Sequence, residues 1–243
     1  MLLTPLICFD ALINLLLPRA CLLCRTPTRE KHHLCQPCLK ELPILYQSCR
    51  KCAQFLHARD GGSLVCGSCL TKPPPYDQVF ALFPYQPPLP RLIAGLKFEE
   101  QFSHATLFSN RLVHAVRRQW YTHSQRPDFI LPMPLHTNRL RERGYNQALE
   151  VARPAAKALS IPLDHSITRC KATLPQHTLP ASKRRQNVAK AFIAQRNYHG
   201  EHIAIVDDVM TTGQTVAALA RLLKRHGARR VDIWCIARCD SQD

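Results

Sequence analysis

The segment from His202 to Gly227 constrains the fold of this chain more than any other stretch. It begins with a short uninterrupted apolar run, Ile203–Val206, which is typical of a parallel strand covered on both faces by helices. An amphipathic helix follows, and Gly227 ends it. Its apolar side chains, spaced three and four residues apart, are Val216, Leu219, Ala220 and Leu223. This order of elements predicts an α/β fold with a mostly parallel sheet.

Two adjacent acids and a loop of small residues join this strand to this helix. Asp207 and Asp208 fall at the predicted carboxyl end of the strand, where ligands bind in open α/β sheets. We expect their carboxylates to accept hydrogen bonds from vicinal sugar hydroxyls or to hold a hydrated Mg²⁺. Gly213 lets the backbone approach a phosphate, and N–H groups at a helix start favour an anion. The predicted phosphate-binding residues are Thr211, Thr212, Gly213, Gln214 and Thr215.

The two common phosphate-loop signatures are not the explanation for this loop. The segment matches neither the Walker pattern G-x-x-x-x-G-K-[ST] nor the dinucleotide turn G-x-G-x-x-G. A purely structural strand-turn-helix with an acidic end is the alternative. We favour a ligand site because adjacent carboxylates repel one another unless a ligand or an ion uses them.

Four C-x-x-C pairs distinguish the first third of the chain. Eight cysteines within 49 residues suffice for two tetrahedral zinc sites with four thiolate ligands each, and a fully ligated ion is structural. The predicted ligands are Cys21, Cys24, Cys35, Cys38, Cys49, Cys52, Cys66 and Cys69. We expect each zinc ion to be bound by two C-x-x-C pairs that are consecutive in the sequence, and interleaved pairs are the alternative. Disulfides and thioredoxin-like redox chemistry are the alternatives, but disulfides belong in oxidising compartments and the redox motif occurs singly.

The length and the prolines indicate two regions. A chain of 243 residues is long enough for one α/β domain and a small module, and seven prolines between Pro73 and Pro90 indicate a stiff connection. We therefore expect a cysteine-rich module with an apolar helix over residues 1–75, and an α/β domain over 76–243. Strands are expected at 78–85, 128–135, 167–170, 191–194, 203–206 and 231–236. Helices are expected at 89–98, 102–120 and 145–159, the last kinked or broken at Pro154.

The N-terminal 17 residues are strongly apolar and resemble a targeting signal only superficially. No basic stretch precedes them, Asp10 and Asn14 interrupt them, and they are too short to cross a bilayer. We expect a helix that packs on the protein, no transmembrane segment and a cytoplasmic location. Peripheral contact with the inner face of the membrane is the alternative.

Positive charge is abundant and is spread over the whole chain. The formal net charge is +16, of which +5 comes from residues 1–75 and +11 from the rest. Two basic segments precede the acidic pair in the sequence. The first carries Arg139, Arg141 and Arg143 in a loop predicted to bind pyrophosphate, and the second is a predicted mobile lid with Lys183, Arg184, Arg185 and Asn187. Solvated charged loops are the alternative for both.

Four motifs together resemble those of the ComF/GntX family. They are GLKF at Gly95–Phe98, PMPLHTNRLRERGYNQA at Pro132–Ala148, RxxNVxxAF at Arg184–Phe192 and VDDVMTTGQT at Val206–Thr215. The resemblance implies an N-terminal zinc-ribbon module, a type I phosphoribosyltransferase fold, and a role in competence, DNA uptake or the use of external DNA. It implies that the acids bind the ribose of phosphoribosyl pyrophosphate (PRPP), that the threonine loop binds the 5′-phosphate and that Mg²⁺ accompanies the ligand.

Two functional hypotheses remain open at this stage. The first is an enzyme that transfers the phosphoribosyl group of Mg²⁺-PRPP to an unidentified acceptor. The second is a non-enzymatic module that binds PRPP or a nucleotide and contacts single-stranded DNA, with Trp120, Tyr121 or Tyr145 stacking on bases. In the second case, the zinc module is also a candidate for docking a DNA-uptake protein. A transcriptional regulator that uses the pocket as a sensor ranks last.

Overall fold

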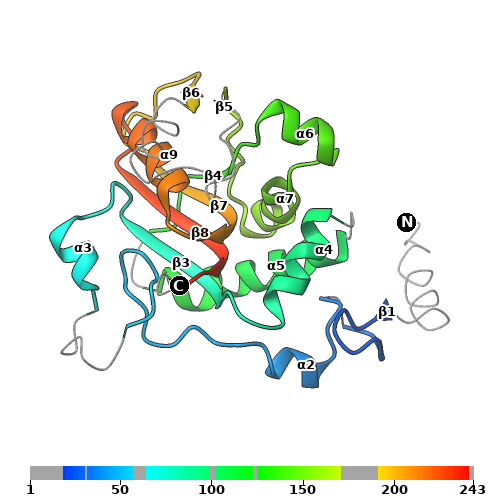
Figure 1. Cartoon of the computed structure of the whole chain (residues 1–243). Helices are drawn as coiled ribbons and strands as arrows, with labels where there is room; N and C mark the ends of the chain where they lie inside the picture. Colours follow the sequence, from blue (N-terminus) through cyan, green and yellow to red (C-terminus); the bar gives the residue numbers. More distant parts are fainter. Residues whose placement is uncertain are drawn as a thin grey trace, which may run out of the picture.

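A four-stranded parallel sheet forms the centre of the computed structural model, which describes residues 19–30, 32–56, 64–98, 102–122, 125–170 and 191–240 (Figure 1). The strands lie in the order β3-β8-β7-β4. Their bounds are Gln78–Pro84 for β3, Phe129–Pro132 for β4, His202–Met210 for β7 and Arg230–Arg238 for β8. All three pairings are parallel, which confirms the predicted α/β class.

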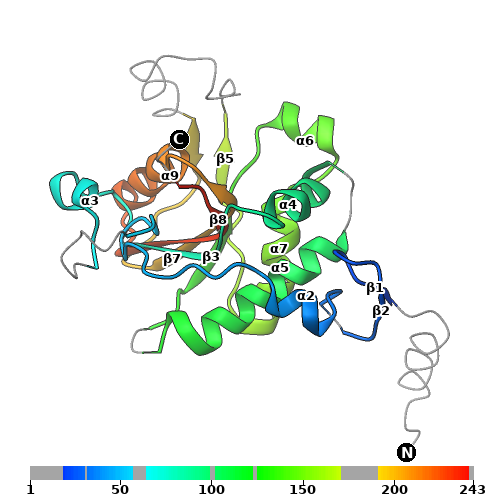
Figure 2. The same cartoon turned by 60° about the horizontal axis from the view of Figure 1, so that its bottom comes forward.

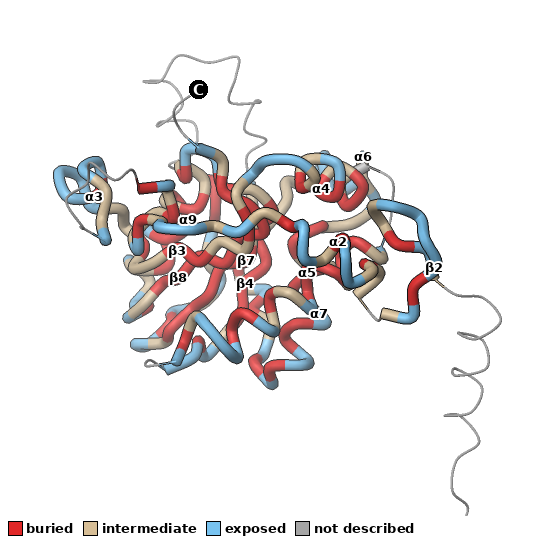
Figure 3. The backbone as a smooth tube through the Cα atoms, turned by 90° about the horizontal axis from the view of Figure 1, so that it is seen from below, coloured by how far each residue is buried: buried red, intermediate tan, exposed pale blue. Residues whose placement is uncertain are grey.

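Helices cover both faces of this sheet. On one face, α4 (Leu89–Phe98), α5 (Phe102–Ala115) and α7 (Gln147–Leu159) pack on alternate strand residues such as Ala204 and Trp234. On the other face, α9 (Gln214–Arg225) packs on Ile203, Ile205 and their neighbours. The central strands are buried between these layers (Figure 3). Apolar residues at consecutive positions of β7 therefore serve two cores, because successive side chains of a strand point to opposite faces.

Several element boundaries differ from the sequence-based expectation. β7 continues to Met210, so both acids lie inside the strand rather than after it. α7 is unbroken at Pro154, which lies on its exposed face, where water can hydrate the carbonyl that loses its partner. The expected helix 102–120 changes after Ala115 into the π-helical turn η2 (Val116–Trp120). β5 (Ile167–Arg169) and β6 (Phe192–Ala194) form a separate antiparallel pair.

The cysteine-rich region is built from short elements that pack beside the α/β domain. They are β1 (Arg19–Ala20), β2 (Pro27–Thr28), α2 (Gln36–Lys40) and α3 (Gly67–Thr71). Figure 2 shows β1, β2 and α2 on the side of α5, whereas α3 lies far from them, towards α9. Residues of the first part, including Leu34 and Leu42, join the core that contains α4 and α5. The apolar segment 1–17 lies outside the described residues.

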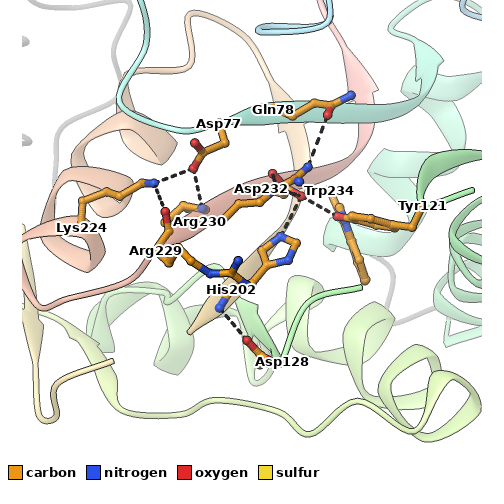
Figure 4. Close-up of polar contacts among 11 residues, drawn as sticks. Asp77, Gln78, Tyr121, Asp128, His202, Lys224, Arg229, Arg230, Asp232 and Trp234 are labelled. Atoms are coloured by element: carbon orange, nitrogen blue, oxygen red, sulfur yellow. Dashed lines mark hydrogen bonds and ion pairs between the residues drawn. The ribbon is translucent and has the colours of Figure 1, made fainter. Parts of the chain in front are cut away.

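A buried polar network occupies the amino-terminal end of the sheet (Figure 4). The carboxylate of Asp232 is fully buried and lies 2.8 Å from His202 Nε2, 2.8 Å from the Tyr121 hydroxyl and 3.0 Å from Arg230 Nε. Burial alone would raise the pKa of Asp232, but the bonds from His202 and Arg230 outweigh it and hold that pKa below its ordinary value. Protein groups surround this acid, so we assign it a structural role.

Within the described ranges, no helix is both long and apolar enough to cross a bilayer.

Candidate functional site

The two adjacent acids of β7 point to opposite faces of the sheet. Asp208 shares its face with Ala204 and Val206, and it meets side chains from the helices on that side. Its Oδ2 atom lies 2.9 Å from Lys97 Nζ, in the last turn of α4, and 3.2 Å from the Nε2 donor of Gln147, in the first turn of α7. The side chain of Asp208 is only 9% exposed, so the ion pair is largely withdrawn from water.

Gln147 is held in place by its own end of α7. Asn146 caps this helix by accepting hydrogen bonds from the backbone N–H groups of Ala148 and Leu149, and its amide donates to the Met133 carbonyl. Arg143 donates to Oε1 of Gln147. A chain of polar contacts therefore runs from Arg143 through Gln147 to the carboxylate of Asp208.

Asp207 has a different environment on the other face. Burial and the neighbouring charge of Asp208 raise its pKa to about 7, although Lys97 and Arg169 act in the opposite direction. The pKa of Arg169 is lowered by burial and by the nearby positive charge of Arg139, while Asp207 raises it. Two guanidinium groups thus lie close enough to repel one another beside a single carboxylate, an arrangement that a bound polyanion would stabilise.

The loop between β7 and α9 turns at Gly213. Gly213 precedes the helix with φ of +71°, in the left-handed region that favours glycine. A Cβ atom at this position would lie 2.5 Å from Met210 Cε. A cavity of about 380 Å³ borders the loop and is lined by Thr212, Gly213 and Gln214 on one side and by residues 72–76 on the other. The loop is therefore open to a ligand from this side.

The three arginines of the first basic segment lie on a short helix, which corrects the expectation of a loop. α6 spans Thr137–Arg143 and ends at Gly144, whose φ is +79°. Arg139 and Arg143 are four residues apart and share a helix face, whereas Arg141 lies on the other side. Arg143 connects to the acid site through its bond to Gln147, and the charge of Arg139 acts on Arg169. Arg141 is exposed, and none of its described contacts joins it to the acids.

Three residues that sequence reasoning left without a role belong to the site: Lys97, Gln147 and Arg169. Lys97 lies within the motif GLKF and Gln147 within PMPLHTNRLRERGYNQA, so membership of these motifs was the sequence signal that could have identified them as site residues. Arg169 follows no recognisable motif, and its position depends on the pairing of β5 with β6.

The aromatic residues expected to stack on bases make contacts within the protein: Tyr121 is buried, and Trp120 and Tyr145 are half-buried. Tyr121 is buried and donates to Asp232, and Trp120 packs on Phe80 with ring centroids 5.1 Å apart. Tyr145 donates to the Leu96 carbonyl over 2.6 Å. Lys183, Arg184, Arg185 and Asn187, the expected lid residues, lie outside the described residues.

The eight cysteines gather into two groups of four, formed by consecutive pairs. Cys21, Cys24, Cys35 and Cys38 make one tetrad, and Cys49, Cys52, Cys66 and Cys69 make the other; the sulfur atoms of each lie within 4.8 Å of one another. Two Sγ–Sγ distances, 3.6 Å in the first tetrad and 3.7 Å in the second, agree with the roughly 3.8 Å that tetrahedral zinc with bonds of about 2.3 Å requires. The donor set and its geometry therefore fit zinc.

Comparisons with known proteins agree with both parts of this description. The chain matches a protein-family model described as Double zinc ribbon domain over residues 12–70, and one described as Phosphoribosyl transferase domain over residues 146–242. It is 39% identical over 229 residues to DNA utilization protein YhgH of Salmonella typhimurium, covering 92% of this chain and 99% of that one. It is 34% identical over 213 residues to Competence protein F of Haemophilus influenzae, covering 86% and 91%.

The likeness to solved structures is weaker. The purine phosphoribosyltransferase from Pyrococcus horikoshii Ot3 is 20% identical, with a TM-score of 0.35 over 54% of this chain and 73% of that one. The assignment of the family does not depend on this overlay.

Proposed function

Because the chain belongs to the ComF/GntX family, with DNA utilization protein YhgH and Competence protein F as relatives, we propose that its α/β domain binds PRPP or a related phosphoribosyl compound. The ligand would lie at the carboxyl end of β7. The protein would act in DNA uptake or in the use of external DNA. Mg²⁺ would accompany it, and two zinc ions would stabilise the cysteine-rich module.

The observation that carries this proposal is the concentration of charge around the acidic pair. Lys97 of α4 pairs with Asp208, and the charge of Arg169 of β5 acts on Asp207. Two arginines of α6 lie one residue further out: the charge of Arg139 acts on Arg169, and Arg143 bonds to Gln147. Carboxylates suit ribose hydroxyls and Mg²⁺, and guanidinium groups suit phosphate oxygens. A compound that carries ribose hydroxyls and phosphate groups next to each other matches this site better than a simple anion or a neutral sugar does.

The same geometry supports transfer of the phosphoribosyl group to an acceptor that the site does not identify. In that reaction, the bond from the anomeric carbon to the pyrophosphate oxygen breaks, and pyrophosphate departs with the electron pair. A lone pair of the acceptor then forms the new bond to that carbon. Lys97, Arg139 and Arg143 would stabilise the leaving pyrophosphate, and the loop Thr211–Thr215 would hold the 5′-phosphate. Mg²⁺ would neutralise charge on the pyrophosphate.

Binding is tested by calorimetry with Mg²⁺-PRPP, and turnover by pyrophosphate release in the presence of nucleobases, amines and oligonucleotides. We expect heat of binding for the natural sequence and its loss in the double variant Asp207→Ala, Asp208→Ala. Glu142→Ala, on the exposed part of α6, is the matched control that keeps binding. An absence of binding by the natural sequence would refute the proposal, and equal pyrophosphate release by the double variant would attribute the activity to a contaminant.

A second candidate function, binding of single-stranded DNA, rests on a different surface. Tyr46, Phe55 and Tyr85 line a cavity of about 530 Å³, and Tyr46 is 65% exposed. Exposed rings can stack on bases, and the basic chain attracts phosphates. Tyr46→Ala should weaken salt-dependent retention of an oligonucleotide, whereas Leu70→Ala, an equally exposed apolar residue outside this cavity, should not. Equal retention by both variants would exclude this surface. Docking of a DNA-uptake protein on the zinc module, and closure of the lid, stay predictions.

A further inference from the structure

Arg238 connects the second cysteine tetrad to the loop after β7. It is the last residue of β8, it is only 7% exposed, and it lies beside Met210, the last residue of β7. Its Nε atom donates to the Cys52 carbonyl over 2.8 Å, and Nη2 donates to Oε1 of Gln54 over 2.8 Å. Its Nη1 atom donates to the carbonyl of Met210 over 3.0 Å and to the carbonyls of Thr211 and Cys239. One guanidinium group thus bonds to the tetrad segment and to the loop at once.

These bonds fix the direction of two loop amides, together with the Cys239 N–H, which also donates to the Met210 carbonyl over 3.0 Å. In a planar trans peptide, the C=O and the N–H of the following residue point in opposite directions. Carbonyls of Met210 and Thr211 that face Arg238 therefore turn the N–H groups of Thr211 and Thr212 to the other side of the loop. A fixed, planar fork of donors can hold several carbonyls in this way, and a lysine ammonium cannot do so with the same geometry.

We propose that Arg238 is a positioning residue, which uses the second tetrad as its support to aim the amides of the loop at the phosphate of the ligand. The second tetrad would then control ligand affinity, although none of its cysteines touches the ligand. The first tetrad would have no such link to this loop, because its surroundings, including Leu34 and Leu42, pack into the core with α4 and α5. The identity of the ligand rests on the proposed function, but the mechanical link does not.

Hydrogen exchange of the backbone amides at residues 209–216 tests the link without any ligand. Gln54→Ala removes one bond between the tetrad segment and Arg238 while leaving all eight cysteines. Lys51→Met is its matched control, because Lys51 bonds the same segment to the Asp77 carbonyl, over 3.1 Å. We expect exchange in the loop to become about tenfold faster in Gln54→Ala, the order of effect of one lost hydrogen bond to a charged group, and to be unchanged in Lys51→Met. Equal exchange in both variants would overturn the proposal.

Two further pairs of variants distinguish a positioning role from general destabilisation of the fold. Cys66→Ser should lose one zinc ion and speed exchange in the loop, whereas Cys24→Ser should lose one zinc ion and leave exchange in the loop unchanged.

Arg238→Met should weaken ribose 5-phosphate binding in calorimetry, and Arg238→Lys should restore only part of that binding. Adding Gln54→Ala to Arg238→Met should cost no further affinity, since the bond is already gone. Additive losses would overturn the proposal. If the natural sequence binds no ribose 5-phosphate, the proposed function fails, and the exchange data still decide the link.

Discussion

Lys97 forms an ion pair with Asp208 across the gap between α4 and β7, with 2.9 Å between Nζ and Oδ2. The lysine is 25% exposed and the carboxylate 9%, so one partner faces the solvent and the other the interior. The pair places a positive charge next to the predicted ribose and pyrophosphate positions before any ligand arrives. Its removal would leave a poorly hydrated carboxylate at the site.

Lys97→Met should lower the affinity for Mg²⁺-PRPP by about tenfold or more, because a charge-assisted contact of this kind contributes on the order of 1.5 to 3 kcal/mol. Calorimetry measures the effect. Lys157→Met, on the exposed side of α7, removes the same charge far from the acids and serves as the control. Equal affinities of the two variants would show that Lys97 plays no part in binding.

Asp207 should make stability depend on pH in a defined direction. Its pKa in the folded protein is about 7, above the ordinary value of 3.8, so the folded state holds a proton that the unfolded state releases. The contribution of Asp207 to the free energy of unfolding is therefore fully present below pH 3.8 and is lost as the pH rises through 7. Asp207→Asn should have no advantage in melting temperature at about pH 3.5 and a clear one at about pH 8. A difference that stays constant over this range would contradict the raised pKa.

The backbone at Gly213 gives a prediction that separates strain from ligand contact. Gly213→Ala should cost about 1 to 2 kcal/mol of stability, the usual cost of a left-handed conformation for a residue with a Cβ atom, and it should also weaken ribose 5-phosphate binding. Gly200→Ala is the matched control, because Gly200 has φ of +87° and no neighbour within 4 Å of an added Cβ. We expect a similar loss of stability from urea unfolding and no loss of affinity. A loss of binding in both variants would show that the weaker binding comes from a destabilised fold and not from the loop at Gly213.

Asp232 should matter for stability and not for the ligand. Asp232→Ala leaves His202 and Arg230 without their buried partner, and breaking a buried charged pair costs about 3 to 5 kcal/mol. Urea unfolding measures this loss. Tyr121→Phe, which removes one hydroxyl bond from the same carboxylate, should cost about 1 to 2 kcal/mol. Binding of Mg²⁺-PRPP by the folded fraction should be unchanged, because this network lies at the opposite end of β7 from the two acids.

The sequence predicted several elements closely, because their signals are local. Apolar runs and helical spacing located β3, α4 and α9 closely. The extension of β7 through Asp207 and Asp208 was not predictable from these residues, since aspartate is rare in strands; the ladder from Asp207 to Cys235 and from Met210 to Arg238 imposes it. Strand pairing is a long-range property, and no local window contains it.

The partners of the acids were missed for the same reason. Lys97 and Asp208 are 111 positions apart in the sequence, and only the packing of α4 against the sheet brings them together. Arg169 reaches its position through an antiparallel pair that has no part in the main sheet. In the sequence, Arg238 is only a polar residue after an apolar run. Four of its five hydrogen-bond acceptors come from segments that the fold brings to the end of β8.

The opposite orientation of Asp207 and Asp208 has a consequence for cooperativity. Each acid extends from a different interior layer, one built around α9 and one around α4, α5 and α7. A molecule coordinated by both would span the rim of the sheet and link the two layers. Its release would then accompany the melting of either layer, so saturating ligand should merge their unfolding into a single transition at a higher temperature.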